Sequence, residues 1–178
     1  MLNEEQIIEG CLQNDSHAQE TLYRRFAPKM FGICLRFTRN KMEAEDVLQD
    51  GFIKVFTYLK DFKNEGSLEG WIRRTMINTA INYYKKMVRK FNETDIEQAD
   101  YVLMEDETAI DRLSNIELLQ LIQELPDGYR MVFNLAIIEG YSHKEIGDML
   151  NISENTSKSQ LSRARNALQM KIKKTKNP

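Results

Sequence analysis

The chain has 178 residues, of which 29% are charged and 42% hydrophobic, with a formal net charge of −2. No apolar run approaches the roughly 20 residues that a membrane-spanning helix needs, and the first residues lack the pattern of a signal peptide, so we expect a cytoplasmic protein. The two cysteines and two histidines are isolated, which excludes a disulfide framework and the usual metal-binding spacings.

Only three prolines and eight glycines interrupt the chain, and no long stretch alternates with a period of two, so we predict an all-α fold. The first helices are expected over residues 3–13, 16–26 and 29–38. A further helix is expected over residues 43–59, with Asn40 placed to cap its start. Its apolar residues recur at helical spacing and predict one buried stripe: Ala44, Val47, Leu48, Val55 and Leu59.

The opposite face of this helix carries polar side chains that suit a protein partner. Asp46, Gln49 and Asp50 share it with Ile53, which is too apolar for open water. Carboxylates on an exposed helix face complement a basic partner and guide its orientation. The pattern predicts a protein-docking face, although the polar residues alone would pass for an ordinary helix surface.

After a turn at Gly66 and Ser67, a basic and aromatic helix is expected. Its cations are Arg73, Arg74, Lys85, Lys86, Arg89 and Lys90. The aromatic residues interleaved with them are Trp71, Tyr83 and Tyr84. Such a surface suits melted nucleic acid, since phosphates pair with Lys and Arg while bases stack on rings. The alternative is that the cations are only solvated and that Trp71 packs in the core.

An acidic stretch follows, with eight acids and no base between residues 92 and 111. Weak periodicity and mutual repulsion predict a flexible linker over residues 92–112. This linker divides the chain into two small helical domains, residues 1–91 and 113–178. Ser114 and Glu117 form a capping box near the start of the second domain.

The second domain ends in two short helices joined by a turn over residues 151–153. Ser142 and Glu145 form a capping box on the first helix, and Ser153 is placed to cap the second. The inner stripe of the second helix is Leu161, Ala164 and Leu168, and its exposed side chains are Lys158, Ser159, Ser162 and Arg163. This is the helix-turn-helix pattern, whose second helix enters the major groove of DNA. The alternative is a basic, solvated helix.

Together, these segments resemble the extracytoplasmic-function (ECF) type of bacterial RNA polymerase sigma factor. The resemblance covers nearly all of the chain and is carried by residues 26–36, 44–56, 62–86, 125–133, 140–146 and 161–165. Proteins of this type keep sigma domains 2 and 4, joined by a linker, which is the layout expected above.

The resemblance implies a role for each segment. The residues that would dock on the clamp helices of the largest subunit of core RNA polymerase are Asp46, Gln49, Asp50 and Ile53. Residues 62–86 would read and melt the −10 element of a promoter, and residues 156–165 would read the −35 element. The candidate DNA-binding residues are Phe62, Trp71, Arg74, Asn78, Lys85, Lys86, Lys158, Ser159, Ser162 and Arg163. An anti-sigma factor is a further candidate partner, and no cofactor or metal is implied.

Three positions depart from the family pattern. Ser157 stands where a β-branched apolar residue is usual, which predicts weaker packing of the recognition helix. Gln160 replaces a common basic residue and removes one candidate phosphate contact. Leu68 replaces an aromatic residue, which puts a stacking role at that position in doubt.

Two other classes of function remain open. A helix-turn-helix regulator that binds operator DNA as a dimer would leave the first domain unexplained, and no helix offers an obvious self-pairing seam. An enzyme is the third class, but the chain has no glycine-rich phosphate loop, no clustered metal ligands and no nucleophile with a plausible base. We therefore expect a sigma factor and not an enzyme.

Overall fold

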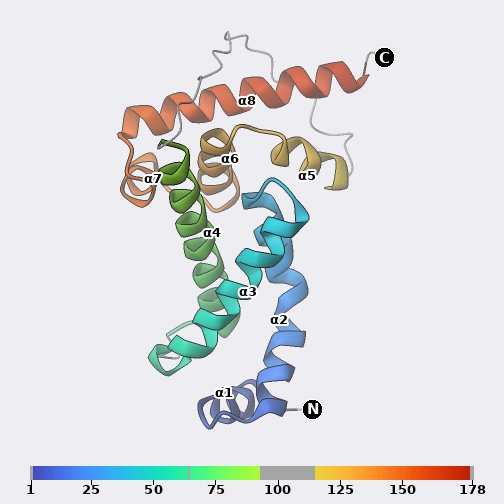
Figure 1. The fold of residues 1–178 in the computed structure, drawn as a ribbon, viewed down its shortest axis with the longest axis vertical. Coiled ribbons are helices and arrows are strands. Elements are labelled where there is room, and N and C mark those ends of the chain that lie inside the picture. The colour runs from blue at the N-terminus through green and yellow to red at the C-terminus, as the bar shows by residue number, and fades with distance from the viewer. Residues whose placement is uncertain (1, 64, 93–114, 177–178) are drawn as a thin grey trace. The chain divides into compact units, whose positions relative to one another are not determined.

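The computed structural model describes residues 2–63, 65–92 and 115–176, and every element in these ranges is helical (Figure 1). The elements are α1 (Glu4–Leu12), α2 (Ser16–Phe37), α3 (Lys41–Tyr58), η1 (Leu59–Asp61), α4 (Leu68–Asn92), α5 (Asn115–Gln123), α6 (Asp127–Phe133), η2 (Asn134–Ile138), α7 (His143–Leu150) and α8 (Glu154–Lys176). None of the described helices is long and apolar enough to cross a membrane. The predicted all-α class is confirmed.

The chain forms two compact units. The first consists of Met1–Leu35 with Asn40–Asn82, and the second of Arg36–Arg39 with Tyr83–Pro178. The ends of α2 and α4 therefore belong to the second unit. The predicted linker and the Ser114 capping box lie almost wholly outside the described residues, so the domain boundaries stay a prediction.

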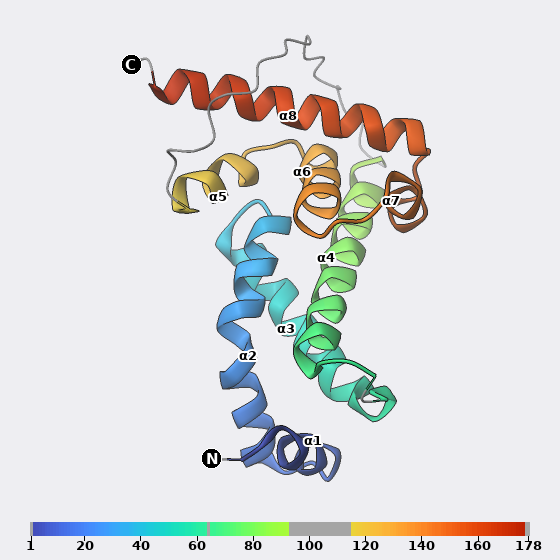
Figure 2. The ribbon, with the colours of Figure 1, turned by 180° about the vertical axis from the view of Figure 1, so that it is seen from behind.

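In the first unit, α2, α3 and α4 pack against one another, with α1 at the N-terminal end of α2 (Figure 2). The inner stripe predicted for residues 43–59 is buried from Ala44 in α3 to Leu59, the first residue of η1. Side chains of α2 and α4 in the same unit are also fully buried: Leu22, Met30, Ile33, Ile72 and Met76. Cys11 and Cys34 are buried and form no disulfide within the described residues, as expected for lone cysteines in a core.

The structure corrects the prediction of two separate helices over residues 16–26 and 29–38. A single helix, α2, runs through Pro28. An internal proline costs about 3 kcal/mol, because it lacks an N–H group and crowds the preceding turn. Phe26, Met30 and Ile33 lie on either side of it and are buried, and each such side chain contributes about 1.5–3 kcal/mol. Burial along one continuous face therefore outweighs the proline.

The cap predicted for α3 is confirmed, because the backbone N–H of Glu43 donates to the side-chain oxygen of Asn40 at 2.9 Å. At the start of α4, the N–H of Gly70 donates to the Ser67 hydroxyl at 3.1 Å. The polar residues that sequence patterns assign to helix starts thus satisfy backbone groups that would otherwise lack partners.

In the second unit, α5, α6 and α7 line one side of α8 (Figure 1). The core cluster consists of Ile122, Leu125, Ala164, Ala167 and Leu168, which includes two of the three residues predicted for the inner stripe of α8; the third, Leu161, is also buried. Arg130 is only 3% exposed, and its guanidinium donates to the carbonyl oxygens of Gln123 and Leu125 at 3.0 and 2.8 Å. It therefore satisfies carbonyl groups at the C-terminal end of α5.

The helix-turn-helix expected from the sequence is present as α7, a turn and α8. Ser142 and Glu145 make the capping box in both directions. Asn151 adopts the left-handed conformation at φ 57°, and the N–H of Thr156 donates to the Ser153 hydroxyl at 3.0 Å. Gly140, just before α7, has φ +78°, which favours glycine.

Gly147 lets α7 approach this turn closely, which gives the first prediction. A Cβ atom at position 147 would lie 2.8 Å from the backbone oxygen of Ile152. Gly147→Ala should lower the free energy of unfolding by about 1–2 kcal/mol, since overpacking against backbone outweighs the better helix propensity of alanine. Denaturant unfolding followed by circular dichroism measures the loss.

Gly32→Ala is the matched control, because a Cβ atom at Gly32 of α2 meets no atom within 4 Å. This variant should be neutral or more stable by up to about 1 kcal/mol. Equal stability changes in the two variants would show that the turn tolerates a side chain at position 147.

Candidate functional site

The residues predicted for protein docking lie together on α3. Asp46, Gln49, Asp50 and Ile53 are all exposed and share one face at helical spacing. Ile53 keeps 57% of its surface accessible, although it is large and apolar. A single exposed apolar residue is ordinary on a soluble protein, so Ile53 indicates a binding surface only together with the apolar residues beside it.

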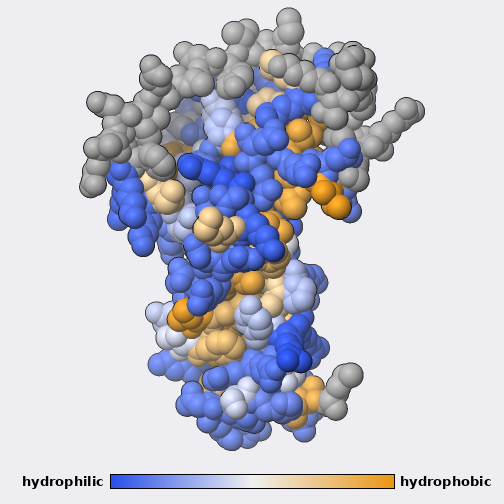
Figure 3. All heavy atoms as spheres, turned by 45° about the vertical axis from the view of Figure 1, so that its right-hand side comes forward, coloured by the Kyte–Doolittle hydropathy of each residue, from blue (hydrophilic) through white to orange (hydrophobic). Residues whose placement is uncertain are grey.

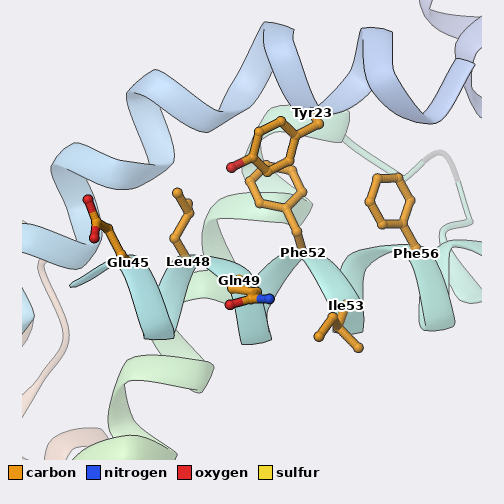
Figure 4. Close-up of a pocket in the computed structure, with 7 residues that line it drawn as sticks. All are labelled: Tyr23, Glu45, Leu48, Gln49, Phe52, Ile53 and Phe56. Carbon is orange, nitrogen blue, oxygen red and sulfur yellow. The ribbon is translucent and has the colours of Figure 1, made fainter. Parts of the chain in front are cut away.

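A hollow of about 470 Å³ adjoins this face (Figure 4). Its lining residues are Tyr23 from α2 and Glu45, Leu48, Gln49, Phe52, Ile53 and Phe56 from α3. The Tyr23 ring lies over Phe52, with ring centroids 4.6 Å apart, and the Phe52 and Phe56 centroids are 6.2 Å apart. Gln49 and Ile53 belong to both the docking face and the hollow. The arrangement can accept an apolar side chain of a partner beside a polar rim.

Sequence reasoning missed the three aromatic residues of this hollow. Phe52 and Phe56 are four residues apart on α3, and that spacing could have placed them on one face. Tyr23 comes from α2, so no pattern within α3 could have found it. Figure 3 shows that hydrophobic side chains interrupt an otherwise hydrophilic surface in several places.

Phe62 and Trp71, both predicted to contact DNA, lie against each other. Phe62 follows η1 and Trp71 lies in the first turn of α4, with ring centroids 5.7 Å apart and planes inclined at 51°. Both side chains are half-buried, so each ring packs on one side and leaves part of its surface accessible. Trp71 thus contributes to packing, as the alternative in the sequence analysis held, and still remains partly accessible to solvent.

The other candidates for the −10 element line α4. Trp71, Asn78 and Lys85 are seven residues apart and share one face with Arg74. Arg74 and Asn78 are exposed, while Lys85 is half-buried. Lys86 is exposed on an adjoining side. Leu68, in contrast, is fully buried, so position 68 presents no side chain for stacking.

The four residues predicted for the −35 element, Lys158, Ser159, Ser162 and Arg163, are exposed on the first half of α8. Lys158 Nζ lies 2.7 Å from a carboxylate oxygen of Glu154, and this bond holds the pKa of Glu154 below its usual value. The Ser159 hydroxyl donates to the Thr156 carbonyl at 3.0 Å. An exposed ion pair one turn apart contributes little to stability, so Lys158 can exchange Glu154 for a phosphate.

Gln160 does not lie on this exposed face. It is half-buried, and a Cβ atom at Gly128 of α6 would lie 3.2 Å from its Nε2 atom. The side chain therefore faces α6. The sequence suggested that Gln160 removes a phosphate contact. Because this side chain faces α6, it is not placed to contact a phosphate.

Ser157 is fully buried and is hydrogen-bonded to His143, with 2.9 Å between its hydroxyl oxygen and Nδ1 of the ring. This bond joins the first residue of α7 to the recognition helix. Position 157 was expected only to weaken the apolar packing of this helix, but its hydroxyl instead makes a polar contact with α7. A buried hydroxyl is stable only with such a partner.

Removing this bond gives the second prediction. Ser157→Ala should lower the free energy of unfolding by about 1 kcal/mol or somewhat more, because the half-buried His143 nitrogen loses its partner. Ser159→Ala is the control, since the Ser159 hydroxyl is exposed and its one hydrogen bond among the described residues lies within its own helix. It should change stability by less than about 0.5 kcal/mol. Similar effects of the two changes would show that the link between α7 and α8 adds nothing.

Two family models match the chain. The model described as Sigma-70 region 2 matches residues 22–90, and the model described as Sigma-70, region 4 matches residues 115–168. Together they span more than half of the chain. The first range contains the docking face and nearly all of α4, and the second contains the helix-turn-helix.

Named relatives are similar along almost their whole length. The RNA polymerase sigma-H factor of Pseudomonas aeruginosa is 28% identical over 176 residues, which cover 93% of this chain and 91% of that protein. The ECF RNA polymerase sigma-E factor of Escherichia coli (strain K12) is 27% identical over 182 residues, which cover 96% and 95%.

A solved structure shares the fold. It is the co-crystal structure of the sigma factor RpoE in complex with the anti-sigma factor NepR from Bartonella quintana. The TM-score is 0.52 at 21% identity, and the match covers 86% of this chain and 96% of that one. A likeness at this identity concerns the fold alone.

Proposed function

Because this chain belongs to the ECF type of bacterial RNA polymerase sigma factor, in the sigma-70 family, we propose that separate exposed helix faces bind core RNA polymerase, the −10 element and the −35 element. It binds core RNA polymerase and directs transcription initiation at specific promoters. The observation that carries this function is the presence of regions 2 and 4 in one chain. In our proposal the boundaries of the two domains are residues 1–91 and 113–178, with the acidic linker between them.

The docking face on α3 is the proposed contact with the clamp helices of the largest polymerase subunit. Asp46 and Asp50 supply negative charge that complements basic side chains and accelerates encounter. Ile53 and the adjoining hollow supply apolar surface, whose burial gives the contact its lasting affinity. Charged residues without this apolar surface would guide the partner to the site, but the partner would dissociate quickly.

The face of α4 is the proposed reader of the melted −10 element. The accessible parts of Phe62 and Trp71 offer rings for unpaired bases, at about 1–3 kcal/mol per stacked base. Arg74, Lys85 and Lys86 would neutralise phosphates, while the exposed amide of Asn78 would contact a base. The exposed residues of α8 would read the −35 element in the major groove.

The assignments of location, regulation and lack of catalysis follow from the sigma factor function. A dimeric helix-turn-helix regulator is not favoured, because it would leave the residues matched by region 2 without a role. In our proposal the chain works in the cytoplasm, where polymerase meets promoters, and catalyses no reaction itself. Polymerase makes the RNA, and an anti-sigma factor would regulate the chain by covering one of its exposed faces.

The third prediction tests the docking face. Gln49→Ala combined with Asp50→Lys should abolish binding to core RNA polymerase, while stability changes by less than about 0.5 kcal/mol because both side chains are exposed. Pulldown with purified core polymerase and a melting curve measure the two effects.

The control for this test is Glu9→Lys, which makes the same change of charge at an exposed position on α1. It should leave binding intact. If a folded Gln49→Ala, Asp50→Lys variant kept its full affinity for core polymerase, the docking face would not lie on α3.

The fourth prediction separates base contacts from phosphate contacts on α8. Arg163→Ala should weaken binding selectively on a preferred −35 sequence, by about 1–3 kcal/mol of discrimination. Lys173→Ala, also exposed and farther along the helix, should weaken binding evenly and reduce its salt dependence. Polymerase carrying each variant is titrated with preferred and scrambled promoters. Equal losses on both promoters for Arg163→Ala would make Arg163 a backbone contact.

A further inference from the structure

The N-terminal turn of the recognition helix presents a side chain that the assignments above do not use. Asn155 is exposed and follows directly after Glu154, the first residue of α8. Residues 155, 159 and 162 recur at the spacing of one helix face, so Asn155 continues the row formed by Ser159 and Ser162. Recognition helices bring their N-terminal residues closest to base edges. Asn155 therefore stands where sequence is read.

The side chain of Asn155 is available for an external contact. Among the residues that the structure describes, it makes no hydrogen bond or ion pair. Its neighbours in the same turn are engaged: Glu154 pairs with Lys158, and the Ser159 hydroxyl bonds within the helix. In the exposed row, Asn155 thus offers a free donor and a free acceptor on one group.

The backbone that carries Asn155 is held in place. The N–H of Thr156 donates to the Ser153 hydroxyl at 3.0 Å, and the N–H of Ser157 donates to the Ser153 carbonyl at 3.0 Å. The partly buried bond between Ser157 and His143 ties the same turn to α7. Because the backbone of this turn is already ordered, binding has only the Asn155 side chain itself to order, which favours a defined contact.

The chemistry of the carboxamide selects its target. In the major groove adenine presents an acceptor, N7, beside a donor, its N6 amino group, whereas guanine presents two acceptors. The Nδ2 group of asparagine donates to N7 while Oδ1 accepts from N6. An uncharged side chain also adds little to general attraction by phosphates.

We infer that Asn155 is a specificity-determining residue that recognises one adenine in the −35 element by this pair of hydrogen bonds. The inference rests on the proposed role of α8 and adds a residue and a base to it. It predicts that one position of the element prefers adenine because of Asn155, independently of Lys158 and Arg163.

The test uses the full chain assembled with core RNA polymerase. Holoenzyme selects from promoter duplexes whose upstream element is randomised, and the bound DNA is sequenced. The unaltered chain should enrich adenine at one position. Asn155→Ala should lose that preference there, by roughly 5- to 100-fold, and keep the preferences at other positions. Asn155→Asp, which keeps the shape but not the donor, should lose it as well.

A second measurement checks the atoms. A promoter with 7-deazaadenine at that position lacks the N7 acceptor. It should bind the unaltered holoenzyme more weakly than the adenine promoter does. The Asn155→Ala holoenzyme should bind the two promoters equally well. Asn115→Ala is the matched control, because Asn115 is exposed on α5 of the same unit.

The outcomes separate the inference from the function on which it rests. Retention of every adenine preference by Asn155→Ala, or an equal loss on all sequences, would overturn the inference while leaving promoter recognition by α8 intact. An unaltered holoenzyme that shows no upstream sequence preference would overturn both.

Discussion

One-sided burial is the constraint on which the proposed recognition surfaces of this protein depend. Each helix proposed to bind a partner packs one face into a core, and its opposite face is exposed. In α3 the stripe from Ala44 to Leu59 is buried, so the turns that carry Asp50 and Ile53 are held rigidly and face outward. In α8, burial of Ala164 fixes the exposed side chains of its first half in the same way. The residues proposed to recognise a partner can therefore change without loss of the core.

Polar contacts at helix ends add the positional accuracy that apolar packing lacks. Hydrophobic contact is non-directional, so a helix packed only by its stripe can slide or turn by small amounts. Ser142 with Glu145, and the His143–Ser157 bond, fix where α7 begins and how it meets α8. Hydrogen bonds from Ser142 hold the pKa of Glu145 below its usual value, so this cap stays charged in mildly acidic solution. A base-reading helix needs this accuracy, since base edges differ by single atoms.

The sequence was sufficient to predict features that depend on residues close together in the chain. It did not predict features that depend on contacts between residues far apart in the chain. The Asn40 cap, the Ser142 capping box and the inner stripes of α3 and α8 follow from spacing alone, and the structure has them. The continuity of α2 through Pro28 depends on burial by other helices, which outweighs a local rule. Tyr23 in the hollow and Gln160 against α6 likewise depend on which elements pack together. No local pattern contains that information.

The central claim is that one chain both binds core RNA polymerase and determines which promoters the polymerase recognises. Transcription reconstituted from purified core RNA polymerase, with and without this chain, tests it most directly, using fragmented genomic DNA of the source bacterium as template. The account predicts that the chain forms a one-to-one complex with the core and that new transcripts start at a limited set of sites with shared upstream elements. Transcripts whose start sites are the same with and without the chain would contradict it.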